Sequence, residues 1–265
     1  MLKYQFIGLV LLAQGAFAQS PFVSFEVATI KPTPLSEYSC GRYLRMQSAH
    51  QFQAKAYTVN GLIAAAYDLT SRAVLGGPPW AESDRFEILA VTPGETRPAQ
   101  DDQIAMLRKL LTDRFGLAFH REKKEFSIYE LTVAKTGPKL IASQAPPDQS
   151  PTLTSTVYPA ASGGFDKIVM PARNATVSQF ASILQRAIVD RPVVDTTGIS
   201  GRFDFDLEWT PDESQFGGNL QPGPPDNAKP SLYTAIEQQL GLRLQAAKGP
   251  VEALVIERVE RPSEN

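Results

Sequence analysis

Apolar residues recur at helical spacing in two stretches of this chain that begin 118 residues apart, after Thr58 and after Thr176. Threonine commonly caps a helix N-terminus, and apolar spacings of three and four residues place one hydrophobic face on each helix. Each stretch is therefore predicted to form an amphipathic helix. The apolar positions are Val59, Leu62, Ile63 and Ala66 in the first stretch and Val177, Phe180, Ala181 and Leu184 in the second.

A strand and a second helix are predicted to follow in both stretches. The strands cover residues 84–88 and 201–205, and in the second of them apolar and acidic residues alternate. The apolar positions of the second helices match at a constant offset of 125 residues, and Gly116 and Gly241 stand where glycine commonly ends a helix. These positions are Leu107, Leu111 and Phe115, which correspond to Leu232, Ile236 and Leu240.

After each of these glycines we expect a hairpin. Its turn falls at Lys123 in the first stretch and at residues 248–250 in the second, and the returning strands run over residues 126–133 and 251–259. The whole pattern predicts an α+β fold built from two homologous helix-strand-helix-hairpin units. In each unit the helices would pack on one face of a small antiparallel or mixed sheet.

The predicted units divide the chain into three parts after residue 18. The first unit covers residues 19–141 and includes an additional edge strand near Phe25 and Val27. Residues 142–166 are rich in Ala, Ser, Thr and Pro and are predicted to be a linker. The second unit covers residues 167–265.

Residues 1–18 have the pattern of a cleavable secretion signal. Lys3 precedes an apolar run, and Ala16 and Ala18 form a small-x-small cleavage site before Gln19. The apolar run is shorter than the roughly 20 residues that span a bilayer. We therefore expect cleavage between Ala18 and Gln19, no membrane span in the mature chain, and a periplasmic or extracellular location.

Charge and cysteine content limit the partners that the chain can have. The full sequence holds 26 basic and 28 acidic residues, and removal of residues 1–18 would take away one lysine and no acid. The basic residues are scattered, which is not typical of a nucleic-acid-binding surface. Cys40 is the only cysteine, so no intramolecular disulfide can form, and a small buried residue is the expected role for it.

The sequence contains no recognisable catalytic motif. Its two histidines, His50 and His120, are not at metal-ligand spacing, and no G-x-S-x-G, P-loop or Rossmann pattern occurs. Asp204, with Asp206 and Glu208, could gather a hard cation or simply form a solvated strand face. We therefore assign no catalytic residue, no metal ligand and no cofactor.

Three residues are candidates for ligand contacts. Trp80 ends a rigid Gly-Gly-Pro-Pro turn, and its ring could anchor the core or stand out as a binding platform. Arg85 and Arg202 occupy the same position in the two predicted strands. These three residues are the sequence-based candidates for a binding site.

Several strings together resemble a soil-associated family of secreted proteins that is expanded in Acidobacteria. They are residues 25–32, residues 76–80, residues 111–115, residues 192–195 and residues 248–252. This resemblance implies an exported domain without an established activity; similar domains are sometimes attached to membrane peptidases of the antibiotic-sensor type. The order of helix, glycine, leucine and strand at Gly116 and Gly241 is also similar to the short N-terminal domains of secretins and TonB-dependent transporters, which is an analogy of fold alone.

Two hypotheses of function follow from these observations. The first is an exported, non-enzymatic binding or sensing module that recognises a peptide, a small ligand, an envelope component or a protein partner, for example by adding a partner's strand to an exposed sheet edge. The second is an exported hydrolase whose site is assembled from Cys40, His50, His120 and Asp204. Convergence of these side chains in a deep pocket would favour the hydrolase.

Overall fold

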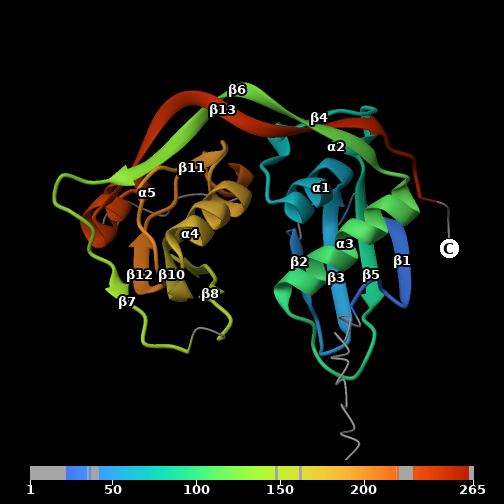
Figure 1. Ribbon diagram of the computed structural model, residues 1–265, viewed down its shortest axis with the longest axis horizontal. Helices are drawn as coiled ribbons and strands as arrows, with labels where there is room; N and C mark the ends of the chain where they lie inside the picture. The colour runs from blue at the N-terminus through green and yellow to red at the C-terminus, as the bar shows by residue number, and fades with distance from the viewer. Residues whose placement is uncertain are drawn as a thin grey trace, which may run out of the picture.

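The computed structural model describes residues 22–34, 36, 42–146, 149–160, 163–218, 220 and 229–262. These residues form two α+β lobes that lie side by side beneath a long two-stranded ribbon (Figure 1). The predicted signal sequence, its cleavage site and Cys40 lie outside the described residues. Within the described part of the chain, no helix is long and apolar enough to cross a membrane.

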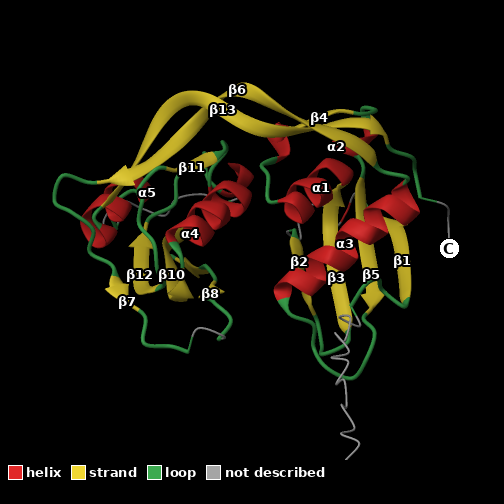
Figure 2. Cartoon of the chain, viewed as in Figure 1, coloured by secondary structure: helices red, strands yellow, loops and turns green. Residues whose placement is uncertain are grey.

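The first lobe consists of one antiparallel sheet with helices on one face (Figure 2). Its strand order is β1-β5-β3-β2, so β1 is an edge strand, as the sequence predicted. The elements are β1 (Val27–Pro32), β2 (Tyr43–Met46), β3 (Gln51–Thr58), α1 (Val59–Tyr67), the 3-10 turn η2 (Ser71–Ala73), β4 (Val74–Gly76), α2 (Trp80–Ser83), β5 (Arg85–Val91) and α3 (Gln100–Phe115).

The second lobe has the sheet order β7-β12-β10-β8, with β9 also paired to β10. The segment that we expected to be a linker, residues 142–166, therefore contributes strands β8 and β9 to this sheet. The elements are β7 (Ile141–Ala142), β8 (Thr152–Leu153), β9 (Thr156–Pro159), β10 (Phe165–Ala175), α4 (Val177–Ile183), the π-helical η3 (Leu184–Ile188), β11 (Val193–Asp195), β12 (Phe203–Trp209), the 3-10 turn η4 (Phe216–Gly218), α5 (Leu232–Ala235) and the π-helical η6 (Ile236–Leu240).

The ribbon above the lobes consists of β6 (Ala118–Val133) and β13 (Leu242–Arg258), which pair antiparallel along almost their whole length. At one end of the ribbon β4 pairs in parallel with β13, and at the other end β11 pairs in parallel with β6. The ribbon therefore belongs to both lobes (Figure 1).

The two predicted hairpins are wrong. Neither the segment around Lys123 nor residues 248–250 turns back; β6 and β13 continue through them and pair with each other. The charged residues of β6 indicated a solvated turn, but they lie on an exposed ribbon, where Arg121 forms an ion pair with Glu252 across the two strands. A ribbon exposed to solvent tolerates the same polar residues as a turn, so local composition could not separate the two.

The predicted helix ends are confirmed. The Thr58 hydroxyl accepts a hydrogen bond from the Gly61 backbone nitrogen at 3.0 Å, and Thr176 forms a reciprocal capping box with Gln179. Gly116 and Gly241 both adopt the left-handed conformation that ends a helix. Contrary to expectation, each first helix is preceded directly by a strand, β3 or β10, which the sequence analysis did not assign.

Each lobe has its own hydrophobic core, and each core includes residues of the ribbon strand that comes from the other half of the chain. Leu254 and Ile256 of β13 pack in the core of the first lobe, whereas Tyr129 and Leu131 of β6 pack in the core of the second. The helix positions predicted to be buried are all at most 1% exposed: Leu62, Leu107, Leu111, Phe115, Phe180, Leu232, Ile236 and Leu240.

One backbone irregularity occurs at matching places in the two sheets. The β3–β5 register shifts between Ala54 and Tyr57, and the β10–β12 register shifts between Ala172 and Ala175. Within these β-bulges, Ala56 has a φ of 56° and Asn174 a φ of 53°. Left-handed conformations are uncommon for residues other than glycine, so two of them 118 residues apart mark the same local geometry.

Candidate functional site

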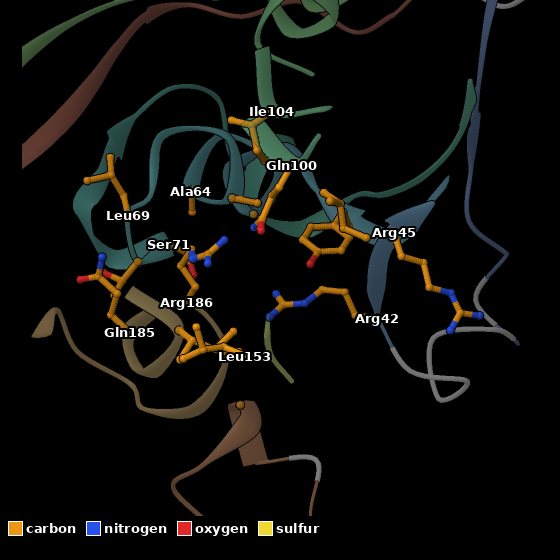
Figure 3. A pocket seen from close by; sticks show the side chains of 18 of the residues that line it. Arg42, Arg45, Ala64, Leu69, Ser71, Gln100, Ile104, Leu153, Gln185 and Arg186 are labelled. Carbon is orange, nitrogen blue, oxygen red and sulfur yellow. The ribbon is translucent and has the colours of Figure 1, made fainter. Parts of the chain in front are cut away.

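A cleft of about 780 Å³ lies between the two lobes, below the ribbon (Figure 3). The first lobe contributes edge strand β2, with Leu44 and Met46, and parts of α1 and α3. The second lobe contributes Leu153 of edge strand β8, the last residue of α4 and part of η3, which continues α4 without a break. The volume is in the range of pockets that bind small ligands or short peptides.

Direct contacts between the lobes beside the cleft centre on Asp68, the residue after α1. Its carboxylate accepts a hydrogen bond from the Ser182 hydroxyl at 2.7 Å and lies 3.0 Å from Nε of Arg186. Its backbone carbonyl accepts a hydrogen bond from the Gln185 side chain at 2.8 Å. An ion pair between Arg72 and Asp190 at 3.4 Å adds a second contact. These contacts hold the second-lobe wall of the cleft against the end of α1.

The described residues that line the cleft carry an excess of positive charge. They include five arginines and one acidic residue, Asp190, although the full chain has a net charge of −2. The arginines are Arg42, Arg45, Arg72, Arg97 and Arg186. An arginine guanidinium is never neutral in a protein and binds carboxylate or phosphate through two parallel hydrogen bonds. The cleft is therefore suited to an anionic group.

Arg42 and Arg186 come from different lobes and point into the same part of the cleft (Figure 3). The Arg42 guanidinium lies 4.9 Å from the centre of the Tyr57 ring, a cation-π arrangement that leaves its edge available for hydrogen bonds. Arg186 contacts Asp68 and the Ser182 carbonyl through Nε. Those contacts fix the direction of its guanidinium.

Tyr57 lies close to both of these arginines. Burial raises the pKa of its hydroxyl above the ordinary value, and the positive charges of Arg42 and Arg186 oppose that rise. The hydroxyl therefore stays neutral at physiological pH and adds no negative charge beside the two arginines.

Gly61 leaves room for the Arg42 side chain. A Cβ atom at this position would lie 3.3 Å from the Tyr57 ring and 3.8 Å from a terminal nitrogen of Arg42. It would also lie 3.1 Å from the Thr58 hydroxyl that caps α1. A Cβ atom here would therefore crowd the helix cap and the Tyr57 ring on which Arg42 stacks, whereas its contact with Arg42 itself would be of ordinary length.

The sequence-based binding candidates do not line this cleft. Trp80 is half-buried, packs edge-on against Phe86 and lies beneath the Arg261 guanidinium. Arg202 donates a hydrogen bond to the carbonyl of Asn174 at 2.8 Å, which supports the bulge in β10. Arg85 begins β5, where its carbonyl accepts a hydrogen bond from the Thr33 backbone nitrogen.

Of the residues considered for a hydrolase site, Cys40 lies outside the described residues, and the other three lie in different parts of the fold. His50 directly precedes β3, His120 is on the ribbon 2.8 Å from Glu257, and Asp204 is on β12. The Asp204 carboxylate accepts a hydrogen bond from the Asn174 backbone nitrogen at 2.8 Å. Among the described residues, no group of three or more His, Cys, Asp or Glu side chains is placed to hold a metal ion.

Sequence reasoning missed Arg42 and Arg186, which are 144 positions apart and belong to no motif. The fold brings them together because the two lobes face each other under the ribbon. The only sequence pattern that could have identified them is an arginine within a few residues of an apolar run. Many other arginines of this chain have the same pattern, so it does not distinguish these two.

A family model described as a protein of unknown function, DUF3738, matches residues 60–259, which is about three quarters of the chain. The chain belongs to the DUF3738 family. The match begins in α1 and ends just after β13, so it covers the second lobe, the ribbon and the first lobe from α1 onward, whereas β1, β2 and β3 precede it. This membership agrees with the expected uncharacterised family. No curated protein and no solved structure gave a significant match.

Proposed function

We propose that this protein is a non-enzymatic binding module that holds an anionic ligand in the cleft between its lobes. The observation that carries the proposal is the excess of arginine in the cleft, five to one acidic residue, in a chain whose net charge is negative. Edge strands from both sheets and apolar side chains line the same space. This combination suits recognition of a ligand that is partly apolar and negatively charged.

The ligand that we propose is a component of the cell envelope or of its surroundings. The sequence pattern of residues 1–18 predicts export, and an exported binding module meets envelope peptides, polymers and proteins. Production with the native leader in a Gram-negative host is expected to give periplasmic protein that begins at Gln19. Recovery of protein that retains Met1 in the membrane fraction would contradict this proposal.

The test of function is capture of a ligand from an envelope extract by the mature protein, followed by identification of the ligand by mass spectrometry. We expect Arg42→Glu and Arg186→Glu each to abolish capture, because each replaces a positive charge in the cleft with a negative one. The melting temperature should change little for Arg42→Glu, because Arg42 is exposed at the surface of the cleft.

Lys248→Glu is the matched control, because it makes the same charge change at an exposed position of the ribbon. It should capture the ligand as well as the wild type does. Capture that survives in both cleft variants would show that the ligand binds elsewhere, and the proposed function would then be wrong.

We also propose that the two lobes descend from one duplicated unit. Three observations support this proposal. The strand orders β1-β5-β3-β2 and β7-β12-β10-β8 are the same when the strands of each sheet are numbered along the chain. The bulges at Ala56 and Asn174 match, and each end of the ribbon pairs in parallel with one short strand. Residues 74–76 pair with residues 254–256, and residues 193–195 pair with residues 129–131.

Thr58→Ala and Thr176→Ala should then cost a similar free energy of unfolding, about 1 kcal/mol each. A cost at only one of these caps would count against equivalent units.

A further inference from the structure

The chemical class of the anionic ligand can be specified, and this inference rests on the proposed function. We propose that the cleft binds an extended, acidic peptide segment that pairs with the open edge of β2, and that Arg42 and Arg186 together hold one of its carboxylates. Three features of the cleft lead to this ligand: the hydrogen-bonding edge of β2, the apolar residues beside it, and the free faces of the two guanidinium groups.

The outer edge of β2 presents unpaired backbone groups to the cleft. Among the residues that the structure describes, β2 is the last strand of its sheet and pairs only with β3. The Gln47 backbone nitrogen donates to the Gln51 carbonyl at 2.7 Å, so that pair is hydrogen-bonded. Bonded and non-bonded pairs alternate in an antiparallel ladder, and therefore the N–H and C=O groups of Leu44 and Met46 point away from β3. An extended peptide can pair with these groups as a fifth strand.

The length and lining of the cleft also suit an extended peptide. The four residues of β2 span about 14 Å at about 3.4 Å per residue, which matches a peptide segment of about four residues. Leu153, from the edge strand of the second sheet, lines the opposite wall, and Ile104 of α3 adds a further apolar surface. Alternate side chains of a bound strand would thus meet apolar residues of both lobes.

The two arginines define the position of the acidic side chain. The Tyr57 ring supports Arg42 on one face, and Asp68 and the Ser182 carbonyl hold Arg186 through its Nε atom. These contacts leave terminal nitrogens of both guanidinium groups directed into the cleft (Figure 3). A carboxylate between two oriented guanidinium groups would accept charge-assisted hydrogen bonds from both of them.

An anionic polymer without backbone amides, such as a phosphate-rich glycan, would use the arginines but leave the β2 edge unpaired. Phosphate sites are usually built from successive backbone N–H groups or from helix N-termini. At the cleft, the Gly61 backbone nitrogen in the first turn of α1 is already bonded to Thr58. The acidic peptide satisfies both the charges and the strand edge.

The experiment uses acetylated, amidated hexapeptides of alternating valine and threonine, with a single glutamate moved through positions two to five. Binding to the mature protein is measured by isothermal titration calorimetry. We expect one register of glutamate to bind best, and its glutamine analogue to bind at least about tenfold more weakly. Arg42→Gln should weaken binding of the glutamate peptide to a similar extent and have little effect on the glutamine peptide.

N-methylation of the peptide backbone, one residue at a time, tests the strand pairing. Alternate amides of an added strand point toward β2, so methylation should weaken binding with a period of two residues. Arg243→Gln is the matched protein control, because it makes the same substitution at an exposed arginine of β13 that does not line the cleft. This variant should bind the glutamate peptide almost as well as the wild type.

Equal affinity for glutamate and glutamine peptides would refute the carboxylate site, and a uniform effect of N-methylation would refute the strand pairing. Dissociation constants above about 1 mM for every peptide would refute the peptide proposal as a whole. If the envelope ligand is nevertheless captured through Arg42 and proves to be a glycan or a lipid, the proposed binding function stands and the peptide inference fails. If nothing is captured through Arg42, both fail.

Discussion

Asp204 lies on β12 with its carboxylate 2.8 Å from the backbone nitrogen of Asn174, the left-handed residue of the β10 bulge. Arg202 donates to the carbonyl of the same residue, and the Asn174 side chain donates to the Gln149 carbonyl at 2.5 Å. Two side chains, Asp204 and Arg202, thus satisfy the backbone groups of Asn174, and the Asn174 side chain ties the bulge to the neighbouring segment. Asp204, which was considered for a cation site, and Arg202, which was a candidate ligand contact, therefore stabilise the backbone of the bulge.

This arrangement predicts a pH dependence. Hydrogen bonds from the Asn174 backbone and the Ser143 hydroxyl lower the pKa of Asp204 below its ordinary value of 3.8. A lowered folded-state pKa means that the charged carboxylate stabilises the fold above pH 3.8, and that this contribution disappears as the pH falls through the folded-state value. We expect Asp204→Asn to be less stable than the wild type at neutral pH, with the difference shrinking as the pH falls below 3.8, as measured by urea denaturation.

The control for this prediction is Asp206→Asn on the same strand, which removes only an exposed ion pair with Arg173. Its stability should stay close to that of the wild type at every pH. A constant difference between Asp204→Asn and the wild type from neutral to acidic pH would contradict a role of the carboxylate charge.

At the scale of elements, the two helix-ending glycines have the same backbone conformation but different surroundings. Gly116 has a φ of 59° and Gly241 a φ of 64°. A Cβ atom at Gly116 would lie 3.6 Å from the flexible Glu260 side chain, whereas one at Gly241 would lie 2.0 Å from the Gly137 carbonyl oxygen. Gly241 is therefore required both by its left-handed conformation and by the close approach of the Gly137 backbone.

We expect Gly116→Ala to lower the free energy of unfolding by about 1–2 kcal/mol, the cost of a left-handed alanine. Gly241→Ala should cost clearly more, because the backbone at Gly137 has to move. Guanidinium denaturation of the two variants measures the difference. Equal losses would mean that the segment around Gly137 does not pack against the end of η6.

At the scale of the whole molecule, the ribbon makes the lobes depend on each other. Leu254 of β13 is fully buried in the first lobe and Leu131 of β6 is fully buried in the second, so each lobe is completed by a strand whose other end belongs to its neighbour. Unfolding of either lobe exposes one end of the ribbon and removes pairing from β4 or β11. The lobes should therefore unfold together.

The chain contains two tryptophans, Trp80 in the first lobe and Trp209 in the second, and these report on the lobes separately. We expect Trp80→Phe and Trp209→Phe each to show a fluorescence transition that coincides with that of circular dichroism. In the Trp80→Phe background, Leu254→Ala should move the Trp209 transition to lower denaturant, with a loss of about 2–5 kcal/mol. A Trp209 transition that does not respond to Leu254→Ala would show that the lobes unfold independently.

The sequence alone determined those features that depend on neighbouring residues. Threonine caps, helix-ending glycines and apolar faces with helical spacing act within one or two turns, so the starts of α1 and α4, the end of α3 and the buried residues of the helices could be predicted. The same local rules predicted turns within β6 and β13, because a polar ribbon and a polar turn have the same composition.

Only the tertiary structure decided how the two halves join and where the cleft lies. Strands β6 and β13 meet through pairs such as Glu125 with Pro250, and no local pattern specifies a partner at that separation in the sequence. Arg42 and Arg186 become neighbours only because the ribbon and the contacts of Asp68 place the lobes face to face. Such long-range pairing depends on the complementarity of whole faces and strand edges, whereas capping and helical periodicity depend on a few adjacent side chains.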